Sequence, residues 1–133
     1  MAGAVAAGVI AAGAAPAHAA DEAVAGYGYV GGAYWCEPDS AIREADDPEG
    51  GWVYIWVTGS DFDGQGQTMQ FKVINPWTNL SYGYSGWFAV PSTVGYMPVA
   101  PVSHGTTFKI CATFGGGPRN TPFRWWGRID YPG

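Results

Sequence analysis

Few residues of this chain have the types and spacing that catalysis requires. Beyond residue 19 the sequence holds a single histidine, His104, in the loop-like segment PVSHGTT. A serine hydrolase needs such a histidine beside a nucleophile, but the segment GYSGW around Ser85 has Trp87 where a nucleophile elbow has glycine. A glycosidase holds two carboxyl groups across a cleft, whereas the acids of residues 37–49 crowd one connection. The sequence therefore predicts a protein without enzymatic activity, with a small hydrolase as the lesser alternative.

One loop has part of a calcium-binding pattern. Asp61, Asp63 and Gln65 fall at the first, third and fifth positions of a calcium-binding loop, and Gly66 falls at the sixth, where the loop turns sharply. Lys72 stands where a bidentate acid should complete the coordination shell. A hairpin turn rich in aspartate and glycine explains the same residues without an ion. We therefore expect no metal and no cofactor, and these residues are weak candidates only.

Aromatic side chains are the clearest candidates for binding. The chain has 7 Trp, 8 Tyr and 6 Phe, all beyond residue 19, and one small core cannot bury so many rings of roughly 150–250 Å² each. In the stretch GWVYIWV, residues 51–57, the two-residue period of a strand places three aromatic rings on one face. Exposed rings at this spacing can stack on sugars or anchor a protein partner. The strip consists of Trp52, Tyr54 and Trp56.

The opposite face of the same stretch is aliphatic. Because both faces are apolar, the alternative interpretation is a central strand buried on both sides. A second candidate surface lies in the segment FRWWGRIDY, residues 123–131, which alternates between apolar and polar positions. It becomes the better candidate if the first strip is buried. Its outward residues include Arg124, Trp126 and Arg128.

Segments with the period of a β-strand alternate with turns rich in glycine and proline along the chain. Strands are expected near residues 52–57, 68–74, 87–90, 106–114 and 123–131. The first two flank one turn and are expected to form a hairpin. The pattern predicts an all-β fold, a small antiparallel β-sandwich or partly open barrel of about six to seven strands.

Two cysteines, Cys36 and Cys111, are expected to form one disulfide bond in an exported chain. Cys111 shares its face of strand 106–114 with Lys109 and Thr113, opposite the apolar face. The bond should therefore fasten the segment around Cys36 to the outer side of this strand instead of crossing the core as in an immunoglobulin domain. Free thiols, a metal pair or an intermolecular bond are the alternatives. The apolar face consists of Phe108, Ile110, Ala112 and Phe114.

The first nineteen residues differ in composition from the rest. They carry no charge and end in Ala17-His18-Ala19, a small-x-small pattern that a signal peptidase accepts. We expect export with cleavage after Ala19, as for the alanine-rich signals of secreted bacterial proteins; a disordered tail on a cytosolic protein is the alternative. The expected domains are a signal peptide (1–19), a Gly- and Tyr-rich N-terminal segment (20–35) and a β-sandwich domain (36–133).

Cleavage after Ala17 would instead place His18 at the new N-terminus. An N-terminal histidine together with His104 could hold a copper ion. The sequence offers an acceptable cleavage site two residues further on, so copper chemistry is a minor alternative.

The charge of the chain excludes two classes of partner. With 11 acidic and 6 basic residues, the formal net charge is −5. Binding to nucleic acid or to an anionic membrane needs an excess of lysine and arginine. The first nineteen residues are too short and too weakly apolar to span a membrane comfortably. We therefore expect neither a nucleic-acid partner nor a membrane span.

Together these patterns predict a secreted, extracellular and non-enzymatic binding module. Its exposed aromatic residues would bind a polysaccharide or another ligand of the cell envelope. The alternative is a protein that binds another protein, as an adaptor, inhibitor or toxin component. Such a protein could use its aromatic surface, or residues 22–34 as an arm that adds a strand to a partner's sheet.

Overall fold

Ten β-strands and one turn of 3-10 helix account for most of the residues that the computed structural model describes, which are 20–31, 33–61, 67–91, 94–116 and 121–133. The expected all-β class is confirmed. Within these ranges no helix is long and apolar enough to span a bilayer. The elements are β2 (Ala20–Val30), β3 (Trp35–Cys36), η1 (Asp39–Ala41), β4 (Arg43–Glu44), β5 (Gly51–Ser60), β6 (Thr68–Ile74), β7 (Ser81–Tyr84), β8 (Phe88–Ala89), β9 (Met97–Val102), β10 (Thr107–Gly115) and β11 (Pro122–Tyr131).

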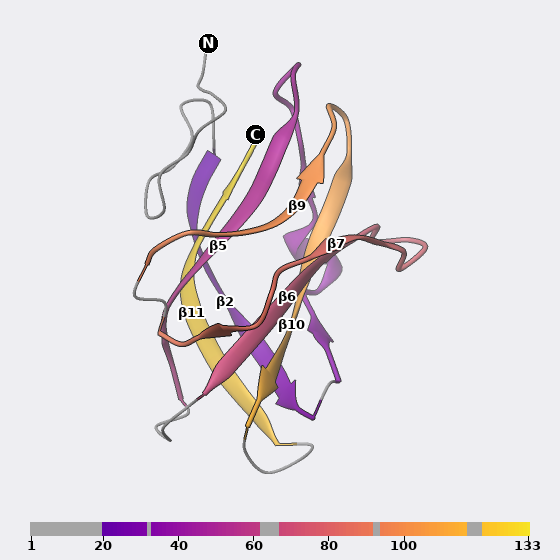
Figure 1. Cartoon of the computed structure of the whole chain (residues 1–133). Helices are drawn as coiled ribbons and strands as arrows, with labels where there is room; N and C mark the ends of the chain where they lie inside the picture. Colours follow the sequence, from indigo (N-terminus) through magenta and orange to yellow (C-terminus); the bar gives the residue numbers. More distant parts are fainter. Residues whose placement is uncertain (1–19, 32, 62–66, 92–93, 117–120) are drawn as a thin grey trace.

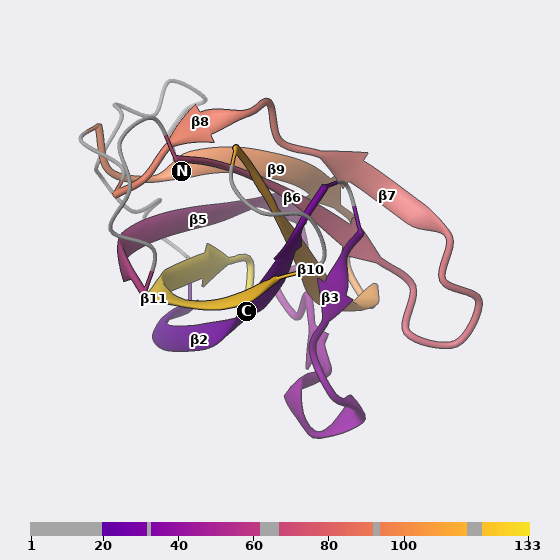
Figure 2. The ribbon, with the colours of Figure 1, turned by 90° about the horizontal axis from the view of Figure 1, so that it is seen from below.

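Seven strands form a continuous sheet that curves into a nearly closed barrel (Figures 1 and 2). Their order is β7-β6-β10-β2-β11-β5-β9, while β3 and β4 pair with β10, and β8 pairs with β6. The two ends of the sheet, β7 and β9, meet at Gly83, where a Cβ would lie 2.9 Å from the Cβ of Ala100. Of the two architectures that the sequence allows, the structure has the partly open barrel.

β2 lies in the middle of this sheet. It pairs antiparallel with β11 through ten consecutive residues, from Ala20 to Tyr29, and parallel with β10 at Tyr29 and Val30. Composition alone predicts that residues 20–35 lie apart from the domain and that 22–34 could serve as an arm for a partner's sheet. In the structure, hydrogen bonds to β11 and β10 make this strand part of the barrel wall, so it is not free to pair elsewhere.

The interior of the barrel is filled by the faces that the alternation predicts. Ile55 of β5 is fully buried and stands opposite Ile129 of β11. Phe71 of β6 meets Trp125 of β11 edge-on, with ring centroids 4.9 Å apart. The predicted apolar faces of β5, β6 and β10 are all buried; they consist of Val53, Ile55 and Val57, of Met69, Phe71 and Val73, and of Phe108, Ile110, Ala112 and Phe114.

The hairpin expected between residues 52 and 74 does not form. β5 pairs with β11 and β9, whereas β6 pairs with β10, β7 and β8. The connection between the two strands, residues 61–67, is longer than the loops of about two to five residues that usually join a hairpin. The two strands therefore lie in different parts of the barrel wall, each beside strands distant in sequence.

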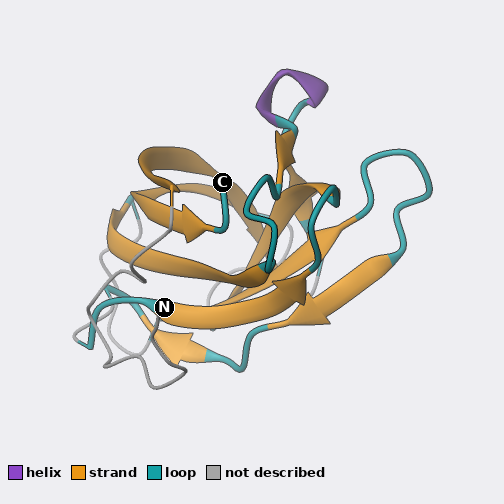
Figure 3. Ribbon diagram, turned by 90° about the horizontal axis from the view of Figure 1, so that it is seen from above, coloured by secondary structure: helices purple, strands orange, loops and turns teal. Residues whose placement is uncertain are grey.

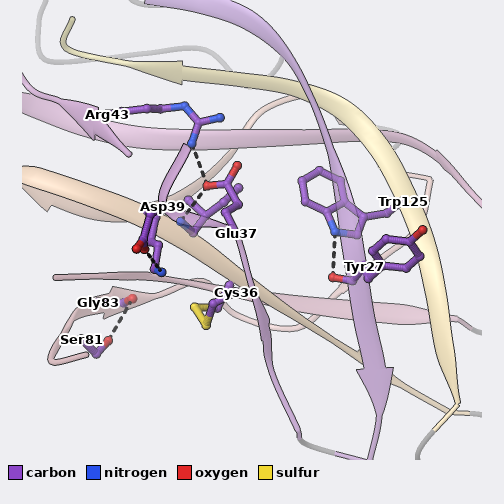
Figure 4. The surroundings of a disulfide bond; sticks show 11 residues. Tyr27, Cys36, Glu37, Asp39, Arg43, Ser81, Gly83 and Trp125 are labelled. Carbon is purple, nitrogen blue, oxygen red and sulfur yellow. Dashed lines mark hydrogen bonds and ion pairs between the residues drawn. A yellow bond between two sulfur atoms is a disulfide. The ribbon is translucent and has the colours of Figure 1, made fainter. Parts of the chain in front are cut away.

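The predicted disulfide bond is present on the outer side of β10 (Figure 4). Cys36 of β3 stands opposite Cys111, and their Cα atoms are 4.0 Å apart. β3 contributes only two residues to the sheet, so pairing alone holds it weakly. The covalent bond therefore anchors β3, and with it the start of the acidic connection between β3 and β5.

A buried ion pair extends this attachment. The Oε1 atom of Glu37 accepts a hydrogen bond from the backbone N–H of Ile110 at 3.0 Å and another from Nη1 of Arg43 at 2.7 Å (Figure 4). The Nε atom of Arg43 also donates to Glu22 of β2 at 2.9 Å. The acidic connection is therefore tied to β10 and β2 at this point, while η1 lies outside the barrel wall (Figure 3).

Replacing Ile55 by alanine should lower the free energy of unfolding by about 2–5 kcal/mol, because it empties a fully buried aliphatic site. Replacing Trp52 by alanine should lower it by clearly less, because this side chain is 45% exposed on the same strand. Urea unfolding followed by circular dichroism measures both. Equal losses would mean that the inner and outer faces of β5 contribute equally to the free energy of unfolding.

Replacing both Cys36 and Cys111 by alanine should lower the free energy of unfolding by roughly 4–5 kcal/mol in the chain-entropy model. The reason is the length of the closed loop, whose ends are 75 positions apart. Urea unfolding of the double variant and the oxidised wild type gives the difference, with a thiol titration of the native wild type as the control. Equal stabilities would show that pairing and the Glu37 contacts suffice without the bond.

Candidate functional site

The structure divides the predicted strip of Trp52, Tyr54 and Trp56. All three side chains point to the outer face of β5, since Val53 and Ile55 fill the core. Trp52 is 45% exposed and Trp56 is half-buried, but Tyr54 is only 9% exposed. Three open rings side by side, as the alternation predicts, are therefore not present.

Tyr96 covers the outer face of β5 beside Trp56. The residue precedes β9 and is only 6% exposed. Its ring meets that of Trp56 edge-on, with centroids 5.5 Å apart, and its hydroxyl donates to Oδ1 of Asp21 at 2.8 Å. Trp56 and Asp21 belong to β5 and β2, the two neighbours of β11, so Tyr96 reaches across the outside of β11. Burial, and then the hydrogen bond to Asp21, raise the pKa of Tyr96 to about 12, which keeps the phenol neutral.

Arg128 of β11 binds the same aspartate. Its Nε donates to Oδ1 of Asp21 at 2.9 Å, and its Nη2 donates to the backbone oxygen of Asp21 at 3.1 Å. Arg128 stands opposite Trp56 in the β11–β5 pair. The guanidinium, which the sequence predicts to bind a ligand, thus binds the same carboxylate that accepts the hydroxyl of Tyr96.

Asp130 is the one buried acid of this region without a partner among the described residues. It is fully buried, with Asp21 opposite it on β2 and Tyr54 opposite it on β5. Neither carboxylate oxygen has a hydrogen-bond partner. Burial, and then the negative charge of Asp21, raise the pKa of Asp130 to about 7. We call these five residues the Asp130 cluster: Asp21, Tyr54, Tyr96, Arg128 and Asp130.

The second predicted surface is open around Trp126. This side chain is 39% exposed on the outer face of β11, between Ala25 of β2 and Gly59 of β5. A Cβ on Gly59 would lie 2.6 Å from Nε1 and 2.7 Å from Cε2 and Cζ2 of the indole. The ring therefore rests directly on the glycine backbone, and both of its neighbours in the sheet are too small to cover it.

Two further exposed side chains extend this surface. Tyr27 of β2 stands opposite Arg124 of β11, and both are exposed. The guanidinium carbon of Arg124 lies 5.9 Å from the ring centre of Trp126, at the outer limit of a cation–π contact. The ring of Tyr27 packs edge-on against Trp35, with centroids 5.4 Å apart. We call Tyr27, Arg124 and Trp126 the Trp126 platform.

The connection between β6 and β7 carries two strongly exposed apolar side chains that the sequence analysis does not single out. Trp77 is 69% exposed and Leu80 is 68% exposed. Asn75 shapes the connection, because its Oδ1 accepts the backbone N–H of Trp77 at 2.9 Å and its own N–H donates to the oxygen of Leu80 at 2.8 Å. The connection projects beyond the barrel wall (Figures 2 and 3). The absence of charge from residue 73 to 108 was a signal for such a surface.

Another aromatic group lies beside the disulfide bond. The ammonium of Lys72 is 4.3 Å from the ring centre of Tyr34 and 5.9 Å from that of Tyr84. The hydroxyl of Tyr34 donates to Oε1 of Gln70 at 2.6 Å, and Tyr84 is exposed. Lys72 is therefore held between two rings.

The candidate residues for metal binding are not brought together where they can be placed. Asp63, Gln65 and His18 lie outside the described residues. The backbone N–H of Asp61 donates to the oxygen of Arg124 at 2.9 Å. In the described part of the chain, no three His, Cys, Asp or Glu side chains gather closely enough to hold a metal ion.

The residues considered for nucleophilic catalysis bind backbone groups instead. Ser85 accepts the N–H of Phe71 at 2.9 Å and donates to the oxygen of Gly86 at 2.8 Å. The Nδ1 atom of His104 lies 3.2 Å from the backbone oxygen of Asp46. These contacts give both side chains a structural role.

Comparisons with protein-family models, with curated proteins and with solved structures find no match for this chain. Its function is therefore inferred from geometry. The open Trp126 platform and the covered Asp130 cluster share the outer face of β2, β11 and β5. This face is the candidate site.

Asp130 should make the protein less stable at neutral than at acidic pH. Its pKa is raised from 3.8 to about 7 in the folded state, so the native state keeps a proton that the unfolded state releases. This proton uptake stabilises the folded state fully below about pH 4, and the stabilisation is lost as the pH rises to about 7. Asp130→Asn removes this titration and should raise the free energy of unfolding at about pH 8 by on the order of 2–4 kcal/mol.

Urea unfolding across this pH range measures the effect, and Asp46→Asn, at an exposed acid, is the matched control. Identical pH profiles for wild type and Asp130→Asn would mean that Asp130 titrates as an ordinary carboxyl group.

Proposed function

We propose that this protein is a secreted, non-enzymatic binding module that holds a polysaccharide of the cell envelope or its surroundings on the outer face of β2, β11 and β5. One observation carries the proposal. Trp126 is open to solvent between Ala25 and Gly59, whose small size leaves room for a flat ligand beside the indole. A buried or crowded tryptophan could not offer such a surface.

The chemistry of the platform suits a sugar. A pyranose ring has a face of C–H groups surrounded by hydroxyls, and stacking on an indole buries that face against the electron-rich ring. Arg124 supplies several N–H donors for hydroxyl oxygens. Tyr27 stands one row along the strands, about 7 Å from Trp126 in the strand direction, within reach of the next sugar. The three side chains could thus contact consecutive units of one chain.

The charge of the protein favours an uncharged glycan. A formal net charge of −5 repels polymers rich in phosphate or carboxylate groups at long range. On the platform itself Arg124 is the only charged member, and its charge is local. We therefore expect neutral polymers to bind more tightly than acidic ones.

Two features support export. A disulfide bond such as Cys36–Cys111 forms and persists mainly in oxidising compartments. The first of the described strands, β2, begins at Ala20, directly after the predicted cleavage point at Ala19. Cleavage there would leave every described strand in the mature protein.

A second candidate function is favoured by the connection between β6 and β7. Trp77 and Leu80 are the most exposed large apolar side chains among the described residues, and tryptophan is a frequent anchor of protein interfaces. The backbone contacts of Asn75 fix this connection before binding, which reduces the entropy lost on association. A protein partner would use this projection and leave the Trp126 platform free.

Retention on insoluble chitin, cellulose and peptidoglycan tests the first function. At least one of these polymers should retain the wild type, and Trp126→Ala should weaken retention by about tenfold or more, because it removes a stacking ring. Gly59→Ala should also weaken it, because the new methyl group displaces the indole without deleting it.

Trp77→Ala is the matched control, since it removes an exposed tryptophan away from the platform. It should bind like the wild type. Equal weakening by Trp77→Ala and Trp126→Ala, or no retention of the wild type on any of the three polymers, would contradict the proposal.

A further inference from the structure

We propose that the same face carries a second aromatic subsite for the glycan, formed by Tyr54 and Trp56, which Tyr96 covers and which opens when Asp130 loses its proton. The inference rests on the proposed function, because this subsite would continue the Trp126 platform along one sugar chain. Its structural part, the movement of Tyr96, can be tested without a ligand.

The subsite and the platform are continuous on the sheet. Across β11, Trp126 lies in a row with Gly59, and two residues further on Arg128 lies in a row with Trp56. Rows of this kind are about 7 Å apart, although a bulge between Trp126 and Gly127 alters the register locally. A glycan stacked on Trp126 therefore meets Trp56 as its next aromatic contact in this direction.

Tyr96 blocks that path in the closed state. Its ring packs edge-on against Trp56 at 5.5 Å, and its hydroxyl is held by Asp21 at 2.8 Å. Tyr54 lies two residues from Trp56 on the same face of β5 and is 9% exposed. Moving Tyr96 away would make the ring of Trp56 more accessible and would open the path toward Tyr54.

Asp130 makes the closed state sensitive to protonation. Its side chain is fully buried, and neither oxygen has a partner among the described residues. As a neutral acid it is tolerated in a dry site. As a carboxylate it would be an unpaired buried charge beside Asp21, which is strongly unfavourable until water or a cation reaches it. The charge of Asp130 also helps to raise the pKa of Tyr96, so the two groups lie near each other. In the proposed gate, the water that hydrates the carboxylate enters where Tyr96 moves away.

Titratable and charged side chains face Asp130 from each element packed against it. Asp21 faces it from β2, Tyr54 from β5, Tyr96 from the segment before β9, and Arg128 lies two residues away on β11. Arg128 is already bound to Asp21. Burial raises the pKa of both Tyr54 and Tyr96, so the phenols stay neutral. The subsite should therefore be closed in mildly acidic solution and open in mildly alkaline solution.

Nuclear Overhauser effects between the rings of Tyr96 and Trp56 report the closed state directly. They should be strong at about pH 5.5 and weak or absent at about pH 8, on either side of the titration. In Asp130→Asn they should persist at both pH values, because the amide cannot ionise. Loss of these contacts at about pH 8 in the wild type and their persistence in Asp130→Asn support the gate.

Retention on the same chitin, cellulose and peptidoglycan then tests the subsite. Wild-type affinity should rise by about tenfold between about pH 5.5 and about pH 8, if roughly a tenth of the molecules are open at the lower pH. Tyr96→Ala should bind tightly at both pH values, and Asp130→Asn should bind at both with the weaker affinity of the platform alone. Circular dichroism shows whether each variant is folded. If Asp130→Asn does not fold, Tyr96→Ala still tests whether removing the cover strengthens binding at about pH 5.5.

The outcomes separate the two proposals. Ring contacts that persist in the wild type at about pH 8 overturn the gate and leave the Trp126 platform untouched. A gate that opens while no polymer retains the wild type at either pH overturns the proposed function, and the subsite with it. An affinity that rises equally in Asp130→Asn assigns the pH dependence to the polymer and overturns the role of Asp130.

Discussion

The pairing of β2 holds the two halves of the barrel together. On one side lie β11, β5 and β9, on the other β10, β6 and β7, and among the described strands β2 alone is hydrogen-bonded to both β10 and β11. Its glycines permit this position, because a Cβ on Gly26 would lie 2.9 Å from the ring of Trp35 and one on Gly28 would lie 2.8 Å from that of Phe114. The backbone oxygen of Tyr27 also accepts the indole N–H of Trp125 at 3.2 Å (Figure 4). The strand that joins the two halves of the barrel thus also forms part of the face that carries the candidate site.

Two buried carboxyl groups, those of Glu37 and Asp130, differ in whether neighbouring groups compensate their charge. Glu37 has a backbone N–H and a guanidinium within hydrogen-bond distance, so its charge is compensated and the contacts tie a connection to β10. Asp130 has no hydrogen-bond donor for either oxygen among the described residues. Arg128 is two residues away on the same strand, but it forms its ion pair with Asp21. A site optimised for stability alone would place an apolar residue at position 130, as at the interior positions of the same strand. The proposed gate uses this uncompensated acid, because it needs a group whose charge can change at this position.

Alternation along single strands was sufficient to predict much of the fold. It identified the core faces of β5, β6 and β10, and it placed Cys111 on the outer side of β10, which located the disulfide bond, because side chains of a strand alternate between two environments. It could not predict which strands are neighbours, and the hairpin of residues 52–74 was wrong for that reason. It also pointed Asp130 and Tyr54 outward, as observed, but it predicted neither their burial nor the cover formed over Trp56 by Tyr96. That residue lies in a turn-rich segment without periodicity, so no local pattern could reveal what it covers.

The position of β2 also determines the order in which the protein can fold. β2 comes first among the described strands, yet the strands that pair with it are the last two: Ala20 pairs with Tyr131, and Tyr29 pairs with both Pro122 and Thr113. Neither of the strands that pair with β2 exists until late in synthesis, and closing so long a loop is a slow step. A chain that has to pass through a membrane in extended form gains from this arrangement. If the protein is exported as proposed, β2 would stay without its partner strands during the passage, and the topology itself would postpone folding until β10 and β11 had followed.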